Sequence, residues 1–185
     1  MLDNLLIYRL AIFNLCGAAI AFWGYERGLI APLFDQDATR LTYIIVALFL
    51  LGMVSVFQRG MKLSRHLNRL KAADRLPDRM KFNKLRDGFN ATKFGAKTAH
   101  IDDMGKWLVL LGLLGTVLGF RWSLSGVDVN SFSSASGTQD SLVVMLGGVF
   151  IAQGTTIVSI VTALWLDVNR RMLATAITLA GEFGR

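Results

Sequence analysis

Long apolar runs alternate with polar stretches along this chain, and four of the runs stand out. They cover residues 5–25, 41–57, 107–124 and 141–166. Each is close to the ~20 residues that an α-helix needs to cross the hydrocarbon core of a bilayer. The pattern predicts an all-α integral membrane protein with four transmembrane helices, and the length of the chain suits a single membrane domain over residues 1–185.

The stretch between the second and third runs is strongly basic. Residues 59–106 contain thirteen Lys or Arg against five Asp, whereas the other two connections are nearly neutral or acidic. The positive-inside rule therefore predicts a cytoplasmic segment at 58–106, both termini in the cytoplasm and a cytoplasmic C-terminal helix at 167–185. Apolar residues at mostly helical spacing predict that the second helix continues beyond the membrane until Pro77 interrupts it.

Composition narrows the class of protein. Residues are 53% hydrophobic, with a mean hydropathy of +0.47, which is too apolar for an ordinary soluble domain. The net charge is +7, and most of the basic residues lie between apolar runs, so membrane topology explains the charge better than nucleic-acid binding. The single cysteine, Cys16, excludes an intrachain disulfide. The first run has no small-residue cleavage site after it, which predicts a retained helix.

No pattern in the chain is typical of an enzyme or a metal site. We find no nucleophile and base at catalytic spacing, and His66 and His100 lie outside any constellation of metal ligands. Asp102 and Asp103 precede the third run, where they would cap its helix or offset basic charge. We therefore expect no catalytic residues, no metal and no cofactor.

The third run, "WLVLLGLLGTVLGFRW", carries small residues on one face. At ~100° per residue, Gly112, Gly115, Gly119 and Thr116 share that face. In lipid, small residues allow two helix backbones to approach closely and hydroxyls add hydrogen bonds across the contact. Thr116 can alternatively bond the carbonyl of Gly112 in its own helix. The face predicts close helix packing.

The fourth run carries a longer stripe of the same kind. Its small and hydroxyl residues are Ser141, Gly148, Ala152, Thr155, Ser159 and Thr162, opposite a large apolar face. A stripe of about four turns exceeds what one close contact needs, which favours a wall shared with a polar or hydrated partner. Because both faces need neighbours and one chain offers few surfaces, we expect a homo-oligomer. Gln153 projects off the stripe.

These two segments resemble a known family. "GLLGTVLGF" is similar to the "GLxGTVxG" signature of the MotA/TolQ/ExbB proton-channel family, and "AQGTTIVSIVTALWLDVN" resembles its final helix. The four-helix order with a basic cytoplasmic segment is similar to the MotA-like branch. The chain departs from the family pattern at Ala163, Phe150 and Arg121, which indicates a divergent member.

The resemblance implies an architecture, a transported ion and a set of ion-path residues. It implies a homopentamer in the bacterial inner membrane, whose third and fourth helices surround two copies of a single-span partner of the MotB/TolR/ExbD type. The partner would carry the membrane aspartate, and the ion would be a proton, with sodium as the alternative. Thr116 matches the first motif threonine, and Thr155 or Thr156 the second. The expected ion-path residues are Thr116, Thr155, Thr156, Ser159 and Thr162. The expected helix-packing residues are Gly112, Gly115, Gly119, Gly148 and Ala152.

One other class of membrane protein stays open. A small pore-forming or holin-like protein would also be short, basic and multi-span. Such a protein would not need matched glycine and hydroxyl faces on two separate helices, and it would work without a single-span partner.

Overall fold

The fold is all helical in the part of the chain that the structure describes. The computed structural model describes residues 5–35, 37, 39–74, 91–125, 127 and 134–182. Its helices are α1 (Leu5–Glu26), α2 (Ala31–Asp35), α3 (Leu41–Asp74), α5 (Ala91–Ser125) and α6 (Ala135–Glu182). Four of them, all except α2, are long and apolar enough to cross a membrane. The predicted all-α fold with four such helices is confirmed to this extent.

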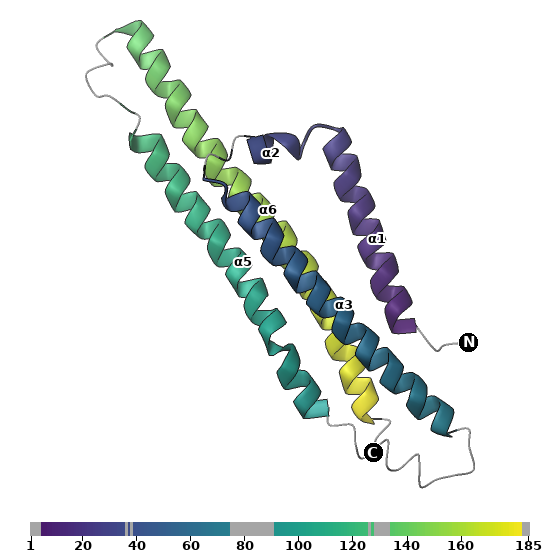
Figure 1. The fold of residues 1–185 in the computed structure, drawn as a ribbon. Coiled ribbons are helices and arrows are strands. Elements are labelled where there is room, and N and C mark those ends of the chain that lie inside the picture. Colours follow the sequence, from purple (N-terminus) through teal and green to yellow (C-terminus); the bar gives the residue numbers. More distant parts are fainter. Residues whose placement is uncertain are drawn as a thin grey trace.

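The helices lie along one long bundle (Figure 1). α5 and α6 run antiparallel, in contact over most of their length, and α3 packs along both of them. α1 stands apart and touches α3 and α6 at few places. Buried apolar side chains from four helices, among them Leu10, Ile45, Leu108 and Leu166, form the core. The outer surface is densely apolar, which is the surface expected of a chain in lipid.

Two of the helices extend well beyond the predicted membrane runs. The run at 41–57 is the first half of α3, which continues to Asp74, as the spacing of its apolar residues predicts. Of the predicted helix at 167–185, residues 167–182 continue α6 with no break after residue 166, and residues 183–185 lie outside the described residues. Residues 75–90 of the basic segment, Pro77 included, lie outside the described residues.

The structure adds detail at three places around the apolar runs. Asp102 and Asp103 do not cap a helix, because α5 already begins at Ala91, but both pair with Lys106 and so offset local basic charge, the other role expected of them. α6 begins at Ala135, inside the serine-rich stretch at 130–137. The first connection contains the short helix α2, whose residue Leu33 packs against Gly154 of α6.

A compact polar network joins α1 to α6. The Trp165 indole N–H donates to Asn14 Oδ1 at 2.7 Å, and Asn14 Nδ2 donates to Asn169 Oδ1 at 2.7 Å. Asn169 Nδ2 returns a bond to Asn14 Oδ1 at 3.2 Å, and the indole lies directly against Gly17. Asn14, an isolated polar residue in an apolar run, is therefore satisfied within the chain, as a polar group in lipid must be.

Asp37 organises the turn that leads into α3. Its carboxylate accepts bonds from the Thr42 N–H at 2.7 Å and from the Thr39 N–H at 3.0 Å. Burial raises the pKa of Asp37, but the hydrogen bonds from Thr39 and Thr42 outweigh it, so the pKa lies below its ordinary value. Arg40 takes a left-handed conformation, with φ of 57°, inside the turn that Asp37 holds.

Candidate functional site

The glycine face of α5 packs directly against the hydroxyl stripe of α6. Gly112 lies against the Ser159 side chain, and Gly115 lies against that of Thr155. A Cβ on either glycine would collide with the facing side chain, so these positions set how closely the two helices approach. Both faces are thus used against each other within one chain.

At the other end of the contact, the backbones of the two helices pack directly against each other. A Cβ on Gly119 would lie 2.6 Å from the Ala152 nitrogen, and one on Gly148 would lie 2.5 Å from the Ser123 nitrogen. The Ser123 hydroxyl also donates to the Met145 carbonyl across the contact at 2.9 Å. Backbone atoms cannot swing aside as a flexible side chain can, so Gly119 and Gly148 are the least replaceable small residues of the contact.

Most hydroxyls of the stripe are buried and satisfied by their own helix. Thr155 and Ser159 are each 1% exposed. The Thr155 hydroxyl donates toward the Ile151 carbonyl at 3.1 Å, Ser159 donates to the Thr156 carbonyl at 2.9 Å, and Thr162 donates to the Val158 carbonyl at 2.8 Å. These side chains line the contact with α5 and do not face an open surface.

Thr116 and Thr156 differ from the rest of the stripe. Their hydroxyl oxygens are 2.5 Å apart across the two helices, and both side chains are half-buried. Thr116 also approaches the Gly112 carbonyl at 3.1 Å, and Thr156 approaches the Ala152 carbonyl at 2.9 Å. Either hydroxyl can be the donor between them, so the pair has two hydrogen-bond arrangements.

This geometry changes two inferences drawn from the residue pattern. The small-residue faces cover one another within one chain, so by themselves they give no reason to expect further copies. The bond to Thr116 also distinguishes Thr156 from Thr155, which the motif alone left as alternatives. Of the expected ion-path residues, only Thr116 and Thr156 bond each other across the helices.

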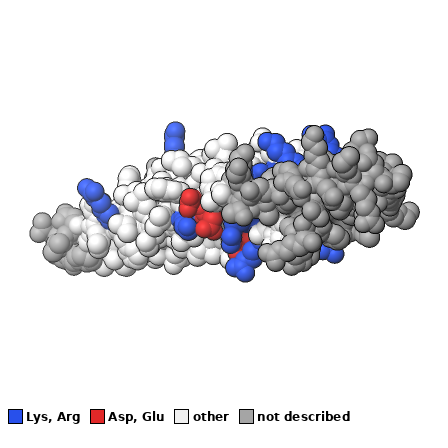
Figure 2. Space-filling view, turned by 90° about the horizontal axis from the view of Figure 1, so that it is seen from below, with Lys and Arg blue, Asp and Glu red and all other residues white. Residues whose placement is uncertain are grey.

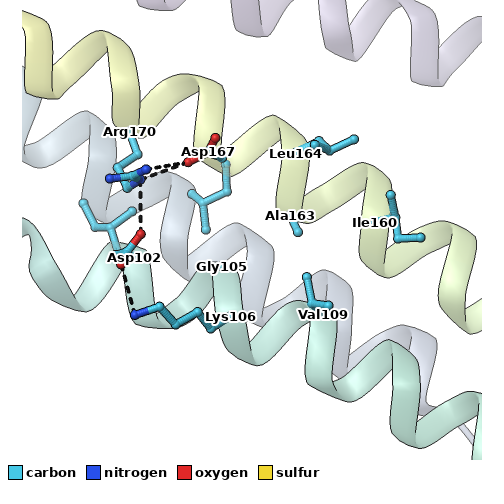
Figure 3. Close-up of a pocket in the computed structure, with 11 residues that line it drawn as sticks. Asp102, Gly105, Lys106, Val109, Ile160, Ala163, Leu164, Asp167 and Arg170 are labelled. Carbon is cyan, nitrogen blue, oxygen red and sulfur yellow. Dashed lines mark hydrogen bonds and ion pairs between the residues drawn. The ribbon is translucent and has the colours of Figure 1, made fainter.

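Ion pairs link α5 and α6 farther along the contact. Asp102 lies 3.4 Å from the Arg170 Nε and 3.1 Å from the Lys106 Nζ, and Arg170 also pairs with Asp167 at 2.7 Å. They border a cavity of about 320 Å³ whose other lining, including Val109, is apolar (Figure 3).

Charged side chains are unevenly distributed on one face of the molecule. Acidic residues lie beside basic ones near the middle of this face, and isolated Lys or Arg residues project from the mostly uncharged surface to the left (Figure 2).

His100 contributes to the packing of α3 on α5. Its Nε2 lies 2.6 Å from the Ser55 hydroxyl, and its Nδ1 lies 3.2 Å from the Arg59 guanidinium, which can only donate. Both ring nitrogens are therefore occupied by α3. Within the described ranges no group of three or more His, Cys, Asp or Glu could hold a metal ion.

Three polar residues of the site could not be placed from the sequence. Ser123 lies off the glycine motif, and only its contact with Gly148 shows its role. Arg121 and Gln153 are exposed on the outer faces of α5 and α6. Their position inside apolar runs was the available signal, but it does not say what they meet.

Comparisons with known proteins give no independent assignment. No family model, no curated protein and no solved structure matches the chain.

Proposed function

We propose that the chain is the channel subunit of an ion-driven membrane motor of the MotA/TolQ/ExbB type in a bacterial inner membrane. The observation that carries this proposal is the Thr116–Thr156 hydroxyl pair, near the middle of two apolar runs. It belongs to the segments that resemble the family motif. The ion would be a proton, with sodium as the alternative, and the basic segment and both termini would face the cytoplasm.

The hydroxyl pair has the chemistry that such a path requires. A partner carboxylate in a low-dielectric wall strongly favours its neutral form, so an ion leaving it needs a polar group to replace lost hydration. Thr116 and Thr156 can each donate and accept, so the direction of the bond between them can reverse. A membrane potential would supply ~2.3 kcal/mol per charge per 100 mV.

The partner and the number of copies come from the family resemblance. Five copies would surround two single-span helices of the MotB/TolR/ExbD type, each carrying one membrane aspartate. The half-buried edge with Thr116 and Thr156 would face those helices, while the buried side chains of Thr155 and Ser159 would fill the contact between α5 and α6.

Neighbouring threonines allow a sharp test by valine replacement. Thr116→Val and Thr156→Val keep the side-chain shape but remove the hydrogen-bonding group, so ion flux should fall about tenfold, as expected for one lost bond of ~1.4 kcal/mol. Thr155→Val should change flux little, because that hydroxyl bonds only its own helix among the described residues. Flux is measured as uptake of protons or ²²Na⁺ into vesicles containing the purified complex under an imposed potential.

The controls separate the proposal from its alternatives. Thr178→Val serves as a surface control, since this exposed hydroxyl bonds only the Ala174 carbonyl. Equal flux in wild type, Thr116→Val and Thr156→Val would contradict the assignment. Undiminished flux through the chain without any single-span partner would instead favour the pore-forming class.

A further inference from the structure

Two polar side chains on the outer faces of the α5–α6 pair have no partner among the described residues. Arg121 of α5 and Gln153 of α6 are both exposed, and neither makes a hydrogen bond or an ion pair there. Both lie within the apolar runs. Polar groups in lipid are costly unless another group bonds them, so each of these side chains calls for a partner beyond the described residues.

Each of the two residues belongs to a row of exposed side chains. The outer row of α5 consists of Trp107, Leu110, Leu114, Val117, Arg121 and Leu124. The outer row of α6 consists of Leu146, Phe150, Gln153, Ile157, Ile160 and Leu164. Successive members of both rows are three or four residues apart, which is the spacing that packs against another helix in a left-handed pair. Each row contains one polar residue.

The internal contact fixes the relative heights of the two rows. Gly115 faces Thr155 and Gly119 faces Ala152, so each step along α5 matches one step back along α6. Continuing this register places Leu114 level with Ile157. Arg121 then lies about three residues, or ~4.5 Å, from the level of Gln153, which is within reach of an arginine side chain.

The two rows also lie on opposite flanks of the α5–α6 pair. On a wheel at ~100° per residue, the row of Arg121 lies about opposite the Gly115–Gly119 face, and the row of Gln153 lies well away from the face of Thr155. A second copy at the same height and orientation can therefore place its α5 row against the α6 row of the first. The two helices would again be antiparallel.

We propose that copies of this chain assemble side by side through these rows, with Arg121 of one copy donating to the Gln153 carbonyl of the next. The contact joins two different surfaces, so repeating it with rotation closes a ring. It deepens the proposed function by naming the contact between copies, and it rests on that function only for the expectation of a ring.

A second copy fits these rows better than an unrelated helix for a chemical reason. A guanidinium offers only donors, whereas the glutamine carbonyl is an acceptor with two lone pairs. The chain thus carries both halves of the bond, at compatible heights, on the two flanks that side-by-side copies bring together. The other polar side chains in the middle of α5 and α6, such as Thr116 and Thr155, already have partners.

Disulfide cross-linking in membranes tests the contact directly. In a Cys16→Ser background, Leu114→Cys with Ile157→Cys places one thiol on each row at the same height. Mild oxidation with copper phenanthroline should give a ladder of dimers, trimers and larger products that collapses on reduction. The matched control, Leu114→Cys with Leu146→Cys, places the thiols about eleven residues apart in height, or ~16 Å, and should give no ladder.

Each other outcome of this experiment overturns the proposal. Dimers from Leu114→Cys alone would show that equal surfaces meet, and an equal ladder in the control would show random collision. Absence of products from the matched pair would show that another surface joins the copies. The cross-linking experiment does not depend on ion flux. If the ladder formed but Thr156→Val left ion flux unaltered in the vesicle experiment, the proposed function would be disproved and the contact between copies would stand.

A double-mutant cycle tests the polar bond within the contact. Gln153→Leu and Arg121→Leu should each lower the yield of the Leu114–Ile157 cross-link several-fold, because each leaves the other polar group unpaired. The double variant should recover most of the loss, and Gln153→Glu should retain the yield. Losses that simply add in the double variant would show that the two side chains do not meet.

Discussion

The helix α6 makes two contacts of opposite kinds, one with α5 and one with α1. Against α5 it is continuous, with glycine opposite hydroxyl or backbone at four levels along the pair. Against α1 it is local, and depends on the Asn14 network and on Gly17 beneath the Trp165 indole. In lipid, where apolar burial drives no association, close backbone approach and polar bonds are the two remaining means of joining helices. Close backbone approach dominates against α5, with cross-helix hydroxyl bonds added, and polar bonds dominate against α1.

The largest effect should come from breaking the continuous contact. Gly119→Leu places a large side chain where even a Cβ would meet the Ala152 backbone at 2.6 Å, so α5 and α6 must separate. We expect a loss of ~3 kcal/mol, at the upper end for overpacking, seen as a lower midpoint of thermal unfolding in detergent. Gly105→Ala is the control, because nothing lies within 4 Å of a Cβ there. Equal midpoints for both variants would refute the close-contact interpretation.

Breaking the local contact should cost less. Asn14→Leu removes the acceptor of the Trp165 N–H and the partner of Asn169, leaving two polar groups without their cross-helix bonds. We expect a loss of ~1–2 kcal/mol and faster hydrogen exchange in α1 alone, because few other contacts hold that helix. Leu15→Ala, at an exposed position of the same helix, should change neither measurement. Exchange that rises in α5 as much as in α1 would count against a local role.

The residue pattern predicted the α5–α6 contact better than the α1–α6 contact. Four apolar runs of about twenty residues are a strong signal, so the helices were predictable, and helical spacing placed Gly112, Gly115 and Gly119 on one face. Which faces meet was not predictable, because that depends on how each helix is rotated. For the same reason Thr155 and Thr156, about 100° apart on the helix, could not be told apart. The Asn14 bond to Asn169 spans 155 positions, and no local pattern reports it.

Replacing Asp37 in the turn before α3 should have a smaller effect on stability, and this effect should depend on pH. The pKa of Asp37 is lowered in the folded state, so its contribution to stability is present above the unfolded value and is lost as pH falls through the folded value. Asp37→Ala should cost ~1 kcal/mol at neutral pH, the usual cost of replacing a capping side chain by alanine. The difference from wild type in unfolding midpoint should shrink below about pH 4. A difference that grows on acidification would show that the carboxylate does not stabilise the turn.

The smallest effect is expected from a substitution at Thr155, which tests whether the α5–α6 contact depends on side-chain size or on hydroxyl hydrogen bonds. Thr155 lies against Gly115, but its hydroxyl donates toward carbonyls of its own helix, so valine keeps the fit and removes bonds that do not cross the contact. Thr155→Val should therefore change the free energy of unfolding by only ~0.5 kcal/mol, the lower end for a hydrogen bond. Thr155→Leu is the matched variant, since it adds bulk at the same position and should destabilise the protein several times more. If valine were as harmful as leucine, the hydroxyl would contribute a bond that the close fit does not explain, and the α6 stripe would join the helices by polar bonds, as α1 does.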